Sequence, residues 1–178
     1  MEAGARWSPV DTSIELPFMT KPSWEFDLAD EAGTAALGRA LATALPTQAV
    51  VGLNGPLGAG KTRLVQAVAD ASGIDRRNVT SPTFVLVQEY RGQRTIYHAD
   101  AYRLADADEF WQLGLDERFE QQAITFVEWA DRFPHCLPAD RLDIHLTPLA
   151  GDRRHVKLIA HSDRFVRVVG RLRDLFTP

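Results

Sequence analysis

The sequence lacks several features that would place it in familiar classes of protein. It holds one cysteine, Cys136, so no disulfide can form within the chain, and a cysteine-based zinc site is not expected. No apolar run approaches the roughly 20 residues that a membrane-spanning helix needs. The first residues, MEAGARWSPVDTSIELPF, lack a basic segment followed by an apolar core and so do not resemble a secretory signal. These absences predict a cytoplasmic protein with no membrane segment.

The chain also lacks an excess of basic residues. Its net charge is -4, which argues against a protein that coats duplex nucleic acid. Its 178 residues suit one domain with a sizeable core. Residues 1–22 contain Pro9, Pro17 and Pro22 and show no clear periodicity. We therefore expect a partly ordered N-terminal extension over 1–22 and a single domain over 23–178.

A glycine-rich loop stands between an apolar strand and an amphipathic helix. The run AVVGL, residues 49–53, has the length and composition of a strand covered on both faces. The stretch that follows, GPLGAGKT at 55–62, fits G-x-x-x-x-G-K-[ST] at every fixed position. Its glycines allow backbone N–H groups to point at phosphate oxygens, and the helix that follows adds a partial positive charge. The pattern predicts a nucleotide-binding P-loop.

Other periodic segments indicate further helices and strands. We expect helices over about 30–45, 106–113 and 163–176, the first with a weak capping arrangement of Asp27 and Asp30. The arginines of the last helix suggest either an RNA contact or, as we prefer, a solvated face. Two hairpins are expected, one across RGQR and one across Gly151-Asp152. The expected strands after the P-loop cover 83–90, 95–101, 123–128, 141–148 and 153–160.

Two residues of the P-loop and two hydroxyls after it are suited to bind a phosphate and its metal. Lys61 would reach the β- and γ-phosphates, and Thr62 would offer its hydroxyl to Mg²⁺. Pro82 favours an extended Ser81, which presents the hydroxyls of Ser81 and Thr83 at the end of a loop. There they would sense a γ-phosphate or its metal, although a simple start of a strand explains the same residues equally well.

Two acids lie on strands downstream of the P-loop. On a strand, His98, Asp100 and Tyr102 project from one face, and buried polar groups there need partners. A histidine in such a place is usually a core residue, whereas Asp100 would hold a Mg²⁺-bound water or orient the attacking water. The apolar strand 123–128 ends on Glu128, where P-loop proteins place an acid that holds Mg²⁺ directly or through water. The alternative is a surface glutamate at a strand end.

Motifs of other P-loop classes are missing. After Lys61 the only lysine is Lys157, so the [NT]-K-x-D motif of GTPases is absent, as is an LSGGQ-like stretch of ABC ATPases. A small-molecule kinase remains a competing hypothesis, with Arg76-Arg77 as a weak candidate for a phosphate lid. A non-catalytic nucleotide-binding protein is a third, and the intact set of Thr62 and the two acids argues against it.

Four motifs in order give a resemblance to a known family. GPLGAGKT, SPTF, YHADAYRL and FVEWADR, over about residues 24–160, look like the bacterial tRNA threonylcarbamoyladenosine biosynthesis ATPase, the TsaE family. The resemblance implies an α/β, three-layer P-loop NTPase-like fold whose mixed, partly antiparallel sheet is flanked by helices. It also implies ATP and Mg²⁺, and two partner proteins, a carbamoyl-transferase subunit and its paralogue, which attach threonylcarbamoyl to adenosine 37 of ANN-decoding tRNAs. The ATPase would reset or drive that machine, with weak turnover alone.

The resemblance assigns roles to individual residues. Lys61 and Thr62 match the family's phosphate and Mg²⁺ residues, Asp100 its catalytic aspartate and Glu128 its Mg²⁺-linked acid. Pro56 departs from the family, which often has Asp or Glu there. The residues expected to hold the nucleotide are Gly55, Leu57, Gly58, Ala59, Gly60, Lys61, Thr62, Arg63, Ser81, Thr83 and Trp129, those expected to hold the metal are Thr62, Asp100 and Glu128, and the catalytic set is Lys61, Asp100 and Glu128.

Overall fold

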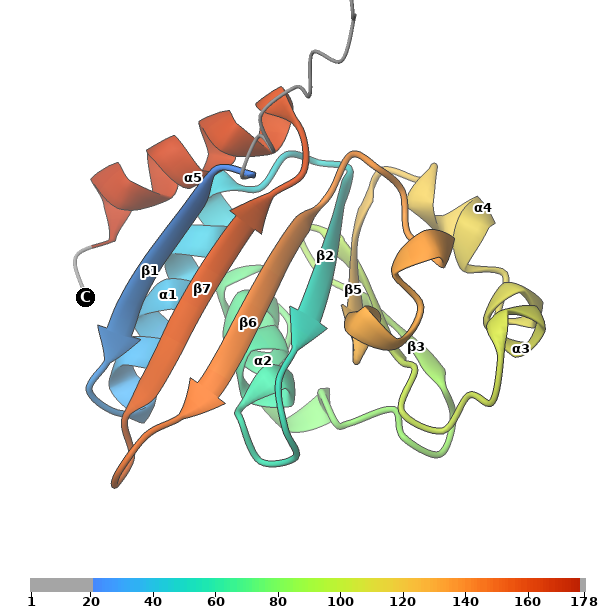
Figure 1. Cartoon of the computed structure of the whole chain (residues 1–178), viewed down its shortest axis with the longest axis horizontal. Helices are drawn as coiled ribbons and strands as arrows, with labels where there is room; N and C mark the ends of the chain where they lie inside the picture. Colours follow the sequence, from blue (N-terminus) through green and yellow to red (C-terminus); the bar gives the residue numbers. More distant parts are fainter. Residues whose placement is uncertain (1–20, 177–178) are drawn as a thin grey trace, which may run out of the picture.

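The computed structural model describes residues 21–176, which form one mixed sheet flanked by helices (Figure 1). The strands in chain order are β1 (Ser23–Leu28), β2 (Ala49–Asn54), β3 (Val87–Arg91), β4 (Thr95–Asp100), β5 (Ala123–Glu128), β6 (Leu142–Pro148) and β7 (Arg154–Ala160). They lie in the order β1-β7-β6-β2-β5-β4-β3. The four strands β6, β2, β5 and β4 are parallel, whereas β1, β7 and β3 pair antiparallel at the two ends. The predicted fold class is confirmed, and so are both hairpins.

Helices cover the two faces of the sheet unequally. The helices are α1 (Glu31–Ala44), α2 (Lys61–Ala71), α3 (Ala107–Gln112), α4 (Leu115–Phe119) and α5 (Asp163–Leu175), with 3-10 turns η1 (Arg76–Asn78), η2 (Ala130–Arg132) and η3 (Pro134–Cys136). In Figure 1, α1 and α2 lie behind the sheet, α5 runs along the upper ends of β1 and β7, and α3 and α4 lie beyond β5 at the other end. The front of β1, β7 and β6 carries no helix in this view.

The pattern of burial follows this arrangement. Every residue of β2 and of β5 is buried, which explains why both read as nearly continuous apolar runs. One apolar cluster lies between the sheet and α1, α2 and α5, and a second surrounds Phe110 and Leu115 on the other side. On the uncovered front, β1 and β7 alternate apolar with charged residues, and Lys157 pairs with Glu25 at 2.6 Å.

Close helix packing behind the sheet depends on a glycine. A Cβ added to Gly38 of α1 would lie 2.3 Å from the Cβ of Ala67 in α2, a distance that real atoms do not reach. Asp30 caps α1 by accepting a hydrogen bond from the N–H of Gly33. Asp27, which we expected to assist, instead lies in β1 and pairs with Arg153 at 2.9 Å.

Two elements were not predicted, and one boundary was wrong. Neither β1 nor α4 was expected, and α4 is little more than one turn. The strand expected from Thr83 begins only at Val87. Residues before it form a turn in which Leu86, with a φ of 66°, donates its N–H to the carbonyl of Pro82 at 2.6 Å.

Three expectations from the sequence concern the N-terminal extension, the arginines of the last helix and the lack of a membrane segment. Apart from Lys21 and Pro22, the predicted N-terminal extension lies outside the described residues. At the C-terminus, Arg164 pairs with Asp140 at 2.7 Å, and Arg173 lies over the ring of Trp24, so these two arginines contact the protein itself. Within residues 21–176 no helix has the length and apolarity to cross a membrane.

Candidate nucleotide-binding site

The loop between β2 and α2 has the backbone that its glycines predict. Gly55, Gly58 and Gly60 have φ angles of 136°, 78° and 101°, which side chains disfavour. A Cβ on Gly55 would lie 2.1 Å from the carbonyl oxygen of Leu146, so this position accepts only glycine. The loop leads into the N-terminus of α2, whose first N–H groups have no partner within the helix. The segment therefore offers N–H groups to an anion.

A pocket of about 380 Å³ opens on this loop. Its size falls within the range of small-molecule sites. It brings together most of the residues that the sequence singled out, from four separate segments of the chain. Its lining consists of Leu57, Gly58, Gly60, Lys61, Thr62, Arg63, Ser81, Thr83, Asp100, Tyr102, Glu128, Trp129 and Arg154. Gly55 and Ala59 belong to the loop but not to the lining.

Glu128 is a buried carboxylate held by two hydrogen bonds. Its side chain accepts from the Thr62 hydroxyl at 2.7 Å and from Nε2 of His98 at 2.8 Å. Burial alone would raise the pKa of Glu128, but the hydrogen bonds from His98 and Thr62 and the charge of Lys61 lower it overall. Glu128 is only 4% exposed, so the alternative of a surface glutamate is wrong.

Asp100 ties the loop after α2 to the sheet. It accepts hydrogen bonds from the hydroxyls of Thr83 at 2.7 Å and Ser81 at 3.4 Å. The N–H of Tyr102 donates to the other carboxylate oxygen at 2.8 Å. In the register of β4 and β5, Asp100 stands directly beside Glu128. The two acids therefore meet at one edge of the sheet, at the carboxyl ends of two parallel strands.

Lys61 lies folded back onto the P-loop. Its Nζ donates to the carbonyl oxygens of Gly55 at 2.7 Å and Pro56 at 3.0 Å, and it lies 3.9 Å from the ring centroid of Trp129. Burial lowers the pKa of Lys61, and the charges of Glu128 and Asp100 partly oppose this. A phosphate is a stronger partner for an ammonium group than a backbone carbonyl.

Two aromatic residues close one side of the pocket. The rings of Tyr102 and Trp129 lie 4.9 Å apart. Trp129 has a φ of 59°, an uncommon conformation for a bulky residue that often marks a functional site. Tyr102 is 52% exposed and does not continue the strand face of His98 and Asp100, because β4 ends at Asp100. The prediction that the three residues share a strand face is wrong for Tyr102.

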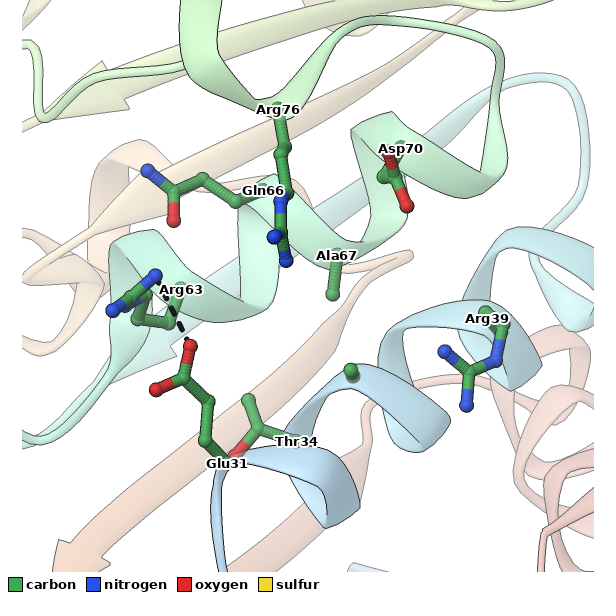
Figure 2. Close-up of a pocket in the computed structure, with 9 residues that line it drawn as sticks. Glu31, Thr34, Arg39, Arg63, Gln66, Ala67, Asp70 and Arg76 are labelled. Atoms are coloured by element: carbon green, nitrogen blue, oxygen red, sulfur yellow. Dashed lines mark ion pairs between the residues drawn. The ribbon is translucent and has the colours of Figure 1, made fainter.

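A second, smaller pocket of about 90 Å³ lies between α1 and α2 (Figure 2). Arg63 lines both pockets, and in Figure 2 its guanidinium turns toward Glu31, with which it pairs at 3.1 Å. Arg76 also lines this second pocket, while Arg77 is paired with Asp75 at 2.5 Å. Neither Arg76 nor Arg77 lines the P-loop pocket, so the structure does not place the candidate kinase lid over it.

The donor set of the P-loop pocket fits Mg²⁺. The Thr62 hydroxyl and the carboxylates of Asp100 and Glu128 are hard oxygen ligands, the type that Mg²⁺ prefers. Within residues 21–176 no group of three or more His, Cys, Asp or Glu forms a metal site.

The fold and the site together define an α/β protein of the P-loop ATPase-like class. Sequence comparison specifies the family. The model of the family described as "Threonylcarbamoyl adenosine biosynthesis protein TsaE" matches residues 28–156. The chain belongs to the TsaE family.

Individual relatives agree with this assignment. The tRNA threonylcarbamoyladenosine biosynthesis protein TsaE of Bacillus subtilis is 41% identical over 117 residues, which cover 65% of this chain and 72% of the relative. The protein of the same name in Treponema pallidum is 37% identical, over 69% of this chain and 90% of the relative. Among solved structures, Bacillus subtilis YdiB matches with a TM-score of 0.73 and 28% identity, over 87% of this chain and 97% of the other.

One pocket residue escaped the sequence analysis. Arg154 lies far from the P-loop in the chain, and RRHVKL reads as an ordinary strand start. No local pattern links Arg154 to the P-loop, because only the pairing of β7 with β6, and of β6 with β2, brings it there.

Proposed function

We propose that the protein binds and hydrolyses ATP as part of the machinery that makes N6-threonylcarbamoyladenosine at position 37 of tRNA. It would act with a transferase subunit and the paralogue of that subunit, and contact tRNA only indirectly. One observation carries the ATPase proposal. The Thr62 hydroxyl and the carboxylates of Asp100 and Glu128 converge on a P-loop in a single pocket.

Each residue has a distinct part in the proposed reaction. The N–H groups of the P-loop and Lys61 bind the phosphate chain, for which Lys61 leaves the carbonyls of Gly55 and Pro56. Bound Mg²⁺ supplies positive charge to the β- and γ-phosphates. Thr62 and Glu128 would hold the metal when it is bound, and Asp100 would position the attacking water or a water of the metal.

The loop of Ser81 and Thr83 is proposed to report the γ-phosphate. Its two hydroxyls are 2.7 Å apart, and both contact Asp100. A change in the charge around Asp100 therefore acts directly on the loop. An ordered loop that responds to a γ-phosphate is a recurring device in P-loop proteins.

The competing kinase hypothesis predicts a different product. Arg76 and Arg77 were the weak candidates for a kinase lid, and they lie outside the P-loop pocket. A hydrolase releases inorganic phosphate, whereas a kinase transfers the γ-phosphoryl group to an acceptor.

The proposed nucleotide is ATP rather than GTP. This preference is supported by the missing [NT]-K-x-D motif and by the family.

The test is a product analysis with γ-labelled ATP. The purified chain is incubated with Mg²⁺ alone, and then with the transferase subunit, its paralogue and tRNA. We expect slow release of inorganic phosphate from the chain alone, faster release with the partners, and none after chelation of the metal. A labelled small-molecule product would establish a kinase, and nucleotide binding without hydrolysis in the full mixture would establish a non-catalytic role.

A further inference from the structure

The C-terminal hairpin brings a guanidinium group to the P-loop. Arg154 is the first residue of β7 and pairs with Pro148 of β6 and Leu28 of β1. In Figure 1 the turn between β6 and β7 and the loop between β2 and α2 lie at the same edge of the sheet. The side chain of Arg154 lines the P-loop pocket.

The contacts of Arg154 hold the loop at its last glycine. Its Nε donates to the carbonyl oxygen of Ala59 at 3.2 Å, and a Cβ added to Gly60 would lie 3.0 Å from the same nitrogen. Its Nη1 donates to the carbonyl of Asp152 at 2.6 Å within the hairpin. A guanidinium has five N–H donors, so these two bonds leave donors for a ligand in the pocket.

The charge of Arg154 has no acidic partner among residues 21–176, within which each ion pair joins other residues. By contrast, its neighbour Arg153 pairs with Asp27 at 2.9 Å, and Arg63 pairs with Glu31 at 3.1 Å. A half-buried guanidinium without a carboxylate, placed beside a phosphate-binding loop, is suited to a planar, charge-assisted contact with phosphate oxygens.

We propose that Arg154 is a second cationic anchor for the nucleotide. It fixes the Ala59-Gly60 segment through Nε and donates its remaining N–H groups to the phosphate chain of a nucleoside di- or triphosphate. It approaches from the β6–β7 side of the P-loop, whereas Asp100 and Glu128 approach from the β5–β4 side. The inference rests on the proposed function for the identity of the ligand, and it adds a binding residue to that site.

The test measures nucleotide affinity rather than turnover. Dissociation constants for ADP and for Mg²⁺-ATP are measured by calorimetry at low and high salt, for the wild type, Arg154→Ala and Arg154→Lys. Arg153→Ala is the matched control, because it removes the same type of side chain from the next position. The melting temperature of each variant shows whether it is folded.

Arg154→Ala is expected to weaken the binding of ADP and ATP by about 10- to 100-fold, the loss expected when a hydrogen bond to a charged group is removed. Arg154→Lys keeps the charge but not the planar fork, so it recovers part of the affinity. The nucleotide affinity of the wild type falls with increasing salt more steeply than that of Arg154→Ala. The variant lacks one contact between a cation and the phosphates, so salt has one contact fewer to screen. Arg153→Ala stays within about twofold of the wild type, since its partner is a surface carboxylate on β1.

Two results would overturn the inference. One is a folded Arg154→Ala variant that binds both nucleotides as the wild type does. The other is a weakened variant that keeps the full salt dependence, since Arg154 would then only brace the loop. Should Arg154→Ala fail to fold, the same comparison of affinity and salt dependence is made with Arg154→Gln, which also removes the charge. If the wild type binds no nucleotide, the proposed function itself fails, and the two failures are thereby distinguished.

Discussion

The two sides of the P-loop differ in charge and in the way they are tied to it. On the β5–β4 side, Glu128 and Asp100 are acids that hold hydroxyls of Thr62 and of the loop at Ser81 and Thr83. On the β6–β7 side, Arg154 holds a backbone carbonyl of the P-loop. On the acidic side, Glu128 accepts a hydrogen bond from the Thr62 hydroxyl, which would be a ligand of the metal. On the basic side, Arg154 holds the backbone of the loop that would bind the phosphates.

This difference suggests a division of labour. We expect substitutions on the acidic side to reduce turnover far more than nucleotide affinity, because an acid close to the phosphates contributes little to binding them. Substitutions on the basic side should do the reverse. Three further predictions test this contrast, in order of the size of their expected effects.

The largest effect is expected for Asp100→Asn. We expect ATP turnover to fall by about 10²–10³, as is common when one group that stabilises the transition state is removed. The affinity for ADP should change little. The measurement is steady-state phosphate release with partners present, together with calorimetry. Asp116→Asn, an exposed acid in the first turn of α4, is the control and should behave as the wild type. Equal losses of affinity and turnover in Asp100→Asn would remove the contrast.

A smaller effect is expected for Thr83→Val, which keeps the shape of the side chain but deletes the hydroxyl that donates to Asp100 at 2.7 Å. We expect turnover to fall by about 3- to 10-fold, in line with the net value of one hydrogen bond. Thr83→Ser restores the donor and should recover most of the activity. If Thr83→Ser is as impaired as Thr83→Val, the hydroxyl is not what the loop uses.

The smallest effect is a pH dependence of stability. The pKa of Glu128 is lowered in the folded protein, so its carboxylate stabilises the fold above its ordinary pKa of 4.5, and this stabilisation is lost as the pH falls through the lower folded value. The melting temperature of the wild type should therefore exceed that of Glu128→Gln at neutral pH. The gap should close in acid.

A matched experiment on the basic side sharpens the pH prediction. An arginine stays charged throughout this range, so the gap between the wild type and Arg154→Gln should not close in acid. A wild-type to Glu128→Gln gap that stays constant from neutral pH to below pH 4 would contradict the carboxylate assignment.

The acidic side of the site was predictable from the sequence, and the basic side was not. The P-loop is a local pattern, and Asp100 and Glu128 stand at the ends of recognisable strands, where parallel neighbours bring their carboxyl ends together. The contact of Arg154 depends on two pairings across the sheet, the antiparallel pairing of β7 with β6 and the parallel pairing of β6 with the P-loop strand β2. The turn at Leu86 was missed because TFVL has the composition of a strand. Hydrogen bonds from Leu86 to Pro82 and from Thr83 to Asp100 instead hold this segment in a turn.

The most direct test of the ATPase proposal is a single-turnover experiment on Glu128→Gln. The variant is saturated with Mg²⁺-ATP in the presence of the transferase subunit and its paralogue, and phosphate release is compared with that of the wild type. The site geometry predicts a rate lower by about 10²–10³, with ADP affinity within a few-fold of the wild type. Hydrolysis at the wild-type rate would contradict the proposed role of this pocket.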